Sequence, residues 1–258
     1  LEFPQRSFDT VAMFNGGVLG SVRKVFLSHD QVKGPLLTAI GTFTHYGNYY
    51  YTRSTWDMKV LDGTLINQIV RMNALGTIDS SYNFNPVTKK AYVGGNGNIN
   101  DGYMQDDGKL ILVGDFTSFH QTPANRIVRL NGDGTVDPTF NISGANSSIY
   151  SIQKIARTGK YLVVGNFTTF NGKPVNQIVR LNEDGTLDES LNIKRFETGY
   201  PNYAYELQDG RIIISGTYQK YDAVARRGFL VLDNDGTASQ NNNNIGSFAG
   251  RVYKVIET

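Results

Sequence analysis

The chain repeats itself along its length. Residues Asn125–Asp137 return almost unchanged as Asn176–Asp188, 51 positions further on. A Gly-x-aromatic step precedes each copy, at Gly114 and Gly165, and occurs once more at Gly216 with the same spacing. Repeats of this length that hold several short strands are typical of β-propeller blades or a related array.

Three landmarks divide the chain into repeat units. They are the Gly-x-aromatic step, an Ile-Val-Arg-Leu-Asn strand and a Gly-Thr turn. The first unit is longer than the others, because residues are inserted after Phe43 and again after Asn83. The units cover about 16–83, 84–141, 142–192 and 193–245.

The third unit shows the expected strands most clearly. Residues 149–155 alternate apolar and polar, as in a strand with one buried face. Residues 160–165 form a nearly continuous apolar run, which indicates a strand between neighbouring sheets. Residues 177–181 are the third strand, and we expect 187–193 to form a weak outermost fourth strand. No segment has sustained helical periodicity, so the sequence predicts an all-β fold.

The two ends of the chain resemble two parts of one unit. Residues 7–16 resemble the end of a unit, and residues 250–256 resemble the start of one, as at 20–26. A composite unit of 246–258 with 1–15 would close the ring and remove two sheet edges. The prediction is a single β-propeller domain over 1–258 with five blades. The composite lacks both the Gly-x-aromatic and the Ile-Val-Arg-Leu-Asn strand, so a thin fifth blade and an incomplete ring both stay open.

The repeat also resembles a known family. Residues 107–117, continuing to Asp137, closely match the bacterial delta-60 repeat, a β-propeller family of unknown function. Unit four departs from the pattern, with Val231 in place of Arg and Ser239 in place of the second Asp. The resemblance implies an exported protein on the surface of a bacterium or outside it, often beside immunoglobulin-like domains. It supplies no catalytic residues.

Composition excludes several classes of protein. The formal net charge is +2, with no basic stripe, which disfavours nucleic acid and anionic membranes as partners. The chain has no cysteine, so disulfides, cysteine-ligated zinc and thiol catalysis are excluded. No signal peptide or membrane-length apolar stretch occurs, and we expect any export signal to lie outside this chain, which begins at Leu1.

Catalytic motifs are missing from the sequence. The only histidines are His29, His45 and His120, which fall at unrelated places in their units and outside any nucleophile elbow or zinc motif. We therefore expect structural histidines and a non-catalytic protein. A hydrolase with two facing carboxylates in the central channel stays open, because spacing cannot exclude it in a propeller.

The repeated acidic turns place oxygen ligands at alternate positions, as calcium loops do. The weak calcium candidates are Asp133, Asp137, Asp184, Asp188 and Asp235. We favour a structural explanation, in which Gly supplies a positive φ angle and Asp and Thr bond nearby backbone N–H groups. No cofactor is predicted.

An arginine recurs on the third strand of units one to three, at Arg71, Arg129 and Arg180. We expect each to form a charge-assisted hydrogen bond with a carboxylate of its own turn, namely Asp79, Asp137 or Asp188.

Departures from the repeat are the best candidates for function. One is the insertion at 45–57, which holds the only Trp, and the other is the extension at 84–100. Both connections should emerge on the same face of the ring. Aromatic rings that stack, beside amides and Arg, suit recognition of a glycan or a protein. The predicted binding residues are Tyr46, Tyr49, Tyr50, Tyr51, Arg53, Trp56, Asn96 and Asn98.

Three functions remain as alternatives. The first is a binding module for a glycan or a surface protein, which the insertion favours. The second is a structural spacer in a larger surface protein, whose rings would pack on an adjoining immunoglobulin-like domain. The third, which the missing motifs disfavour, is a glycan hydrolase.

Overall fold

The computed structural model describes residues 17–18, 20–49, 61–140 and 142–240. The regular structure in these residues is entirely β, so the predicted all-β class is confirmed. Within these ranges, no helix is long and apolar enough to span a membrane.

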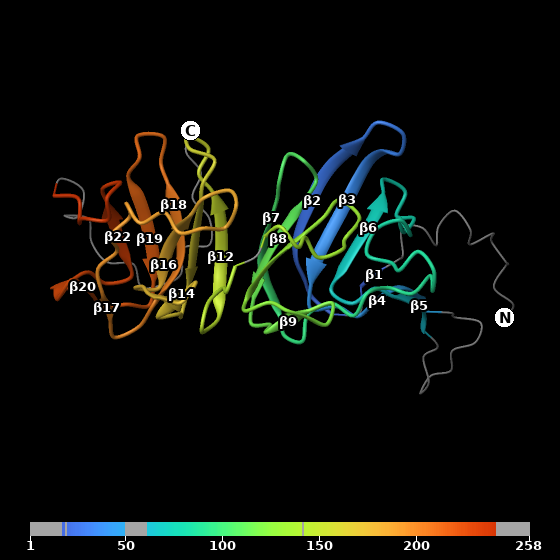
Figure 1. The fold of residues 1–258 in the computed structure, drawn as a ribbon, viewed down its shortest axis with the longest axis horizontal. Helices are drawn as coiled ribbons and strands as arrows, with labels where there is room; N and C mark the ends of the chain where they lie inside the picture. The colour runs from blue at the N-terminus through green and yellow to red at the C-terminus, as the bar shows by residue number, and fades with distance from the viewer. Residues whose placement is uncertain (1–16, 19, 50–60, 141, 241–258) are drawn as a thin grey trace, which may run out of the picture.

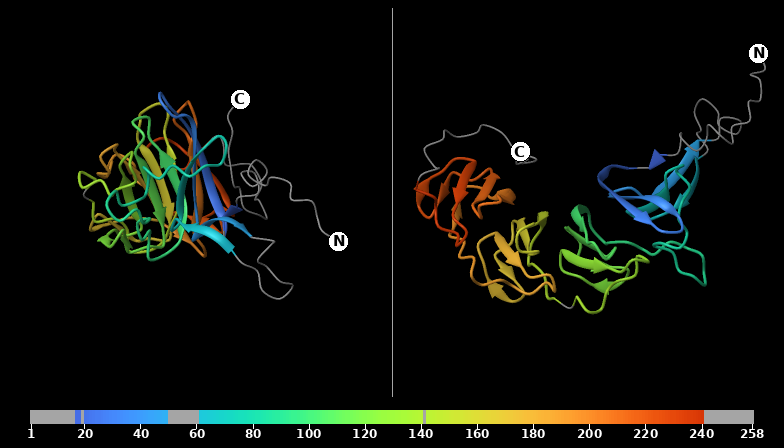
Figure 2. Two further views of the ribbon diagram at one scale, coloured as in Figure 1. Left: turned by 90° about the vertical axis from the view of Figure 1, so that its right-hand side faces the viewer. Right: turned by 90° about the horizontal axis from the view of Figure 1, so that it is seen from above.

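Each repeat unit contains one main sheet of three antiparallel strands, and these four main sheets follow one another along the chain (Figure 1). In every sheet the second strand lies between the first and the third. Seen from above in Figure 2, the sheets lie side by side along an arc, as propeller blades do. In chain order the strands are β2 (Val22–Asp30), β3 (Gly34–Gly41) and β6 (Ile69–Asn73); β7 (Ile99–Met104), β8 (Leu110–Gly114) and β11 (Ile127–Leu130); β12 (Ile149–Lys154), β13 (Tyr161–Gly165) and β16 (Ile178–Leu181); β18 (Pro201–Glu206), β19 (Ile212–Gly216) and β22 (Phe229–Leu232).

Smaller sheets lie along the lower side of Figure 1 and are built mainly from the connections between second and third strands; β1 and β17, which precede the first strands of units one and four, add one strand each. Units two and three each carry a short hairpin there, and unit one carries a larger version that contains the start of the insertion. The strands are β1 (Gly17–Val18), β4 (His45–Tyr49) and β5 (Leu61–Leu65); β9 (Ser118–Phe119) and β10 (Thr122–Pro123); β14 (Thr169–Phe170) and β15 (Lys173–Pro174); β17 (Phe196–Glu197), β20 (Lys220–Tyr221) and β21 (Val224–Ala225).

The core lies between neighbouring sheets. Every residue of β8 and of β13 is buried, as the continuous apolar runs predicted. The aromatic residues of the Gly-x-aromatic steps, from Phe43 to Tyr218, are almost completely buried between the blades. The glycine recurs because a Cβ at Gly165 would lie 2.2 Å from the Ser148 carbonyl oxygen of the adjoining strand. A side chain at that position would therefore separate two paired strands.

The expected fourth strand at 187–193 is not formed. A single bridge, Leu181 to Leu187, joins this segment to β16, and units one, two and four have the equivalent bridge. The Asp188 N–H donates to the Arg180 carbonyl oxygen, and the Asp188 carboxylate then accepts from Ser190 N–H. This side-chain turn directs the chain away from the sheet edge after one bridge.

The composite fifth unit, residues 246–258 with 1–15, lies outside the described residues. It stays a prediction from the sequence.

Candidate binding face

The described start of the insertion continues the hairpin of unit one. β4 pairs with β5 from His45–Leu65 to Tyr49–Leu61 and also pairs with β1. The Tyr46 hydroxyl donates to the Gly76 carbonyl oxygen at 2.7 Å, and its ring packs on the core of unit one. Burial raises the pKa of this phenol. Tyr46 therefore anchors the hairpin to the Gly-Thr turn of its own unit.

Of the other predicted binding residues of the insertion, only Tyr49 lies within the described residues. Tyr49 ends β4, and its backbone pairs with Leu61. Tyr50, Tyr51, Arg53 and Trp56 lie outside the described residues.

The extension at 84–100 packs against the end of the connection that carries the insertion. Asn67 Nδ2 donates to the Tyr92 carbonyl oxygen at 2.7 Å. Gln68 accepts from Gly95 N–H at 2.8 Å and donates to the Gly97 carbonyl oxygen at 2.9 Å. The extension is therefore attached to unit one just before β6. Residues 50–57 of the insertion lie outside the described residues, so its nearness to the extension stays a prediction.

His120 fastens the extension to unit two. Its Nδ1 accepts from Gly94 N–H at 3.1 Å, so the proton of the neutral ring lies on Nε2, which faces the Gly134 carbonyl oxygen at 3.1 Å. The ring also packs between Tyr92 and Phe119. Burial lowers the pKa of His120 to about 4, outweighing the hydrogen bond to Gly134 that raises it.

In unit three, an asparagine makes the two hydrogen bonds that His120 makes in unit two. Asn171 lies 51 positions after His120, accepts from Gly144 N–H at 3.0 Å and donates to the Gly185 carbonyl oxygen at 3.3 Å. The imidazole of His120 thus replaces a carboxamide in the scaffold. His29 and His45 lie on β2 and β4 of unit one, and His45 Nδ1 lies 2.9 Å from the Thr44 hydroxyl.

The two predicted asparagines of the extension differ. Asn96 Oδ1 accepts from the N–H groups of Thr117 and Ser118, and its Nδ2 donates to the Thr117 hydroxyl. Asn146 makes the same contacts in unit three, so Asn96 is part of the repeated scaffold. Asn98 is exposed, with one long hydrogen bond of 3.4 Å to Asp115. Both side chains are exposed, but that of Asn96 is held by three hydrogen bonds and that of Asn98 by one long one.

In the acidic turns, the aspartate oxygens accept hydrogen bonds from residues of the same turn. Asp133 Oδ1 accepts from Thr135 N–H at 2.9 Å and from its hydroxyl at 2.6 Å, and Asp184 and Asp235 repeat the pattern with Thr186 and Thr237. The glycines of these turns have φ near 90°, which favours glycine. The turns form the hydrogen bonds and positive φ angles that the structural explanation predicted.

The predicted ion pairs of the third strands are confirmed. Arg71, Arg129 and Arg180 each place Nε 2.6–2.8 Å from the carboxylate of Asp79, Asp137 or Asp188. Lys109 shares Asp137, and Lys160 shares Asp188.

These pairs determine the charge state of the carboxylates. Desolvation alone would raise the pKa of Asp188, but hydrogen bonds from Lys160, Ser190 and Arg180 outweigh it and hold the pKa well below its usual range. In the described part of the chain, no group of three or more His, Asp or Glu side chains is arranged to hold a metal ion.

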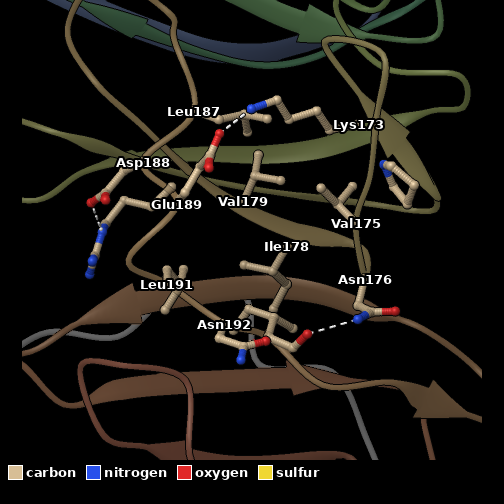
Figure 3. A pocket seen from close by; sticks show the side chains of 13 residues that line it. Lys173, Val175, Asn176, Ile178, Val179, Leu187, Asp188, Glu189, Leu191 and Asn192 are labelled. Atoms are coloured by element: carbon tan, nitrogen blue, oxygen red, sulfur yellow. Dashed lines mark hydrogen bonds and ion pairs between the residues drawn. The ribbon is translucent and has the colours of Figure 1, made fainter.

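A pocket that the sequence analysis missed lies in unit three, between the β15–β16 segment and the chain after Leu187 (Figure 3). Its volume is about 280 Å³, and Val175, Val179, Leu187 and Leu191 form its apolar lining. Lys173 and Glu189 form an ion pair beside it. One sequence feature could have indicated this pocket. The residue three positions after Asp188 is Leu191, whereas the equivalent residue is aromatic in units one and two.

One comparison with known proteins gives a match. The model of a β-propeller domain of unknown function, DUF5122, matches residues 105–140 and 157–191. These segments form most of units two and three, where the motif is most regular. No curated protein and no solved structure matches the chain.

Proposed function

We propose, on the premise that the chain belongs to the DUF5122 β-propeller family that its second and third units match, that it is a non-catalytic binding module. Its ligand would be a glycan or a protein, recognised by the face that carries the insertion and the extension. This face is defined by residues 45–57 and 84–100. The family resemblance supports a location at the surface of a bacterium or outside it as part of this proposal.

The main support is that the extension contacts unit one, whose sequence carries the insertion. Asn67 and Gln68 hold the extension through Tyr92, Gly95 and Gly97, so the extension is attached directly to the blade that bears the insertion. Binding residues concentrate on loops that a rigid scaffold positions. Here the scaffold is the pair of buried sheets in units one and two.

The chemistry of the two segments supports the same function. The insertion contributes Tyr50, Tyr51, Arg53 and Trp56 to the sequence of this face, and the extension contributes the exposed Asn98. Aromatic rings stack on flat apolar surfaces at low entropic cost, and amides make directed hydrogen bonds. Both sugars and protein surfaces offer such partners.

The test is binding of the wild type and two variants to a glycan array and to a panel of surface proteins. We expect a ligand whose binding is weakened at least tenfold by Trp56→Ala and less by Asn98→Ala. Val32→Ala is the control, because Val32 is exposed at the tip of the β2–β3 hairpin, on the opposite side of the blade in Figure 1. Equal loss in the control, or no ligand on either panel, would argue for a spacer instead. Release of product from polysaccharides by the wild type would argue for a hydrolase.

A further inference from the structure

Beside its pocket, unit three differs from units one and two at a position that is aromatic in both of them. Three residues after the turn aspartate, unit one has Tyr82, unit two has Phe140 and unit three has Leu191. Tyr82 and Phe140 are 1% and 8% exposed. Unit three thus carries a smaller side chain where units one and two bury a ring.

The rings of units one and two have a defined environment. The Arg71 guanidinium lies 4.2 Å from the Tyr82 ring centroid, and that of Arg129 lies 4.6 Å from Phe140. These are favourable cation–π distances. Arg180, the equivalent arginine of unit three, is among the residues that line the pocket. Unit three therefore keeps the arginine that contacts a ring in units one and two, but it lacks the ring.

The surroundings of the pocket suit a ring that is attached to a polar chain. Val175, Val179 and Leu191 give an apolar wall, and Asn176 at one end donates to the Ile193 carbonyl oxygen at 2.8 Å (Figure 3). The side chains of Lys173 and Glu189 are mostly exposed, so their ion pair contributes little and opens readily. Once parted, they offer a donor and an acceptor to a peptide backbone.

We propose that this pocket binds an aromatic side chain of a protein partner. The ring of the partner takes the position that Phe140 takes in unit two, against the apolar wall and Arg180. Lys173 and Glu189 bind the main chain on either side of that ring. The site belongs to unit three, so it is separate from the candidate face of units one and two and does not depend on the proposed function.

An NMR titration of the full chain tests the proposal. The probes are N-acetyl-phenylalanine amide, N-acetyl-leucine amide and p-cresol. We expect the phenylalanine amide to shift the methyl resonances of Val175, Val179 and Leu191, with weaker effects from the other two probes. Shifts of equal size from the leucine amide, or none from the phenylalanine amide, would overturn the site. If p-cresol binds as tightly as the phenylalanine amide, the peptide groups contribute nothing, and a protein partner is not the ligand of this pocket.

Two reciprocal variants make the test specific. Leu191→Phe supplies the missing ring, so it should abolish the shifts and raise the melting temperature. Phe140→Leu removes the ring of unit two, so it should create a second set of shifts at Val128, the counterpart of Val179. Binding that survives Leu191→Phe would contradict the proposal. If the Phe140→Leu protein binds the probe only in unit three, then the leucine in place of an aromatic residue is not what creates the site.

Discussion

Arg180 joins two blades by contacting Asn234 in the acidic turn of the next unit. Its Nη1 donates to the main-chain oxygen of Asn234 at 3.3 Å and to its Oδ1 at 3.0 Å. Likewise, Arg71 Nη1 donates to the Gly132 carbonyl oxygen, and Arg129 Nη1 donates to the Glu183 carbonyl oxygen. Each arginine therefore binds its own turn aspartate and also holds the following blade. Val231 replaces the arginine in unit four, so the series ends there.

Replacing Arg180 should destabilise the protein strongly. Arg180 and Asp188 side chains are only 7% and 8% exposed, so Arg180→Ala leaves a buried carboxylate with Lys160 as its remaining cation. We expect a loss of about 3 kcal/mol in the free energy of unfolding, measured by urea denaturation. Arg211→Ala is the matched control, because the Arg211–Asp209 pair is exposed and should contribute less than about 1 kcal/mol. Equal losses in both variants would contradict the role of Arg180.

Stability should fall between pH 6.5 and pH 4 because of His120. Burial lowers its pKa from 6.5 to about 4, so in this range the unfolded chain binds a proton that the folded ring does not. The stabilisation is complete above pH 6.5 and is lost as the pH falls, by at most about 3 kcal/mol. Thermal melts across this range would measure it.

His120→Asn gives the control, since Asn171 already fills the equivalent position with the same two contacts. The variant should fold and lose most of the dependence between pH 6.5 and 4. The paired aspartates, whose pKa values are held well below their usual range, should cause a separate loss at lower pH in both proteins. An unchanged profile in the variant would exclude His120 as the source.

The features that could be predicted from the sequence are those that several units repeat. The Gly-x-aromatic step occurs in all four units and its ring is buried each time, and the arginine–aspartate pair forms in units one to three, where both residues are present eight positions apart. The missing fourth strand was harder to predict, because it depends on a hydrogen bond from Ser190 N–H to Asp188 that competes with strand pairing.

The site was less predictable because composition does not give the direction of a side chain. Tyr46 was expected to bind a ligand, whereas its hydroxyl donates a hydrogen bond to the Gly76 carbonyl oxygen. Asn96 was also expected to bind a ligand, but it holds a loop to the scaffold, whereas His120 has the structural role that was expected of it. The pocket beside Leu191 depends on the volume that one side chain leaves among its neighbours, and a single sequence does not report that volume.

Removal of calcium should leave the melting temperature unchanged. Asp184 Oδ1 accepts two hydrogen bonds from Thr186, and Asp188 binds Arg180, Lys160 and Ser190. A metal ion would have to displace these donors, two of which are cations. Scanning calorimetry with EDTA and with added calcium would measure the effect. A rise in melting temperature with calcium, lost in Asp184→Asn, would instead support a metal site in the turns.

Gly165→Ala should be among the most damaging single substitutions in the third unit. The new Cβ would lie 2.2 Å from the Ser148 carbonyl oxygen and 2.9 Å from the Ile149 Cα, both backbone atoms that cannot move without separating β12 from β13. We expect a loss of about 3 kcal/mol or a failure to fold. Gly132→Ala is the control, because its nearest neighbour, the Gly108 carbonyl oxygen, is 4.0 Å away. Unfolding midpoints in urea distinguish the two, and a mild effect of Gly165→Ala would show that close strand approach is not why this glycine recurs.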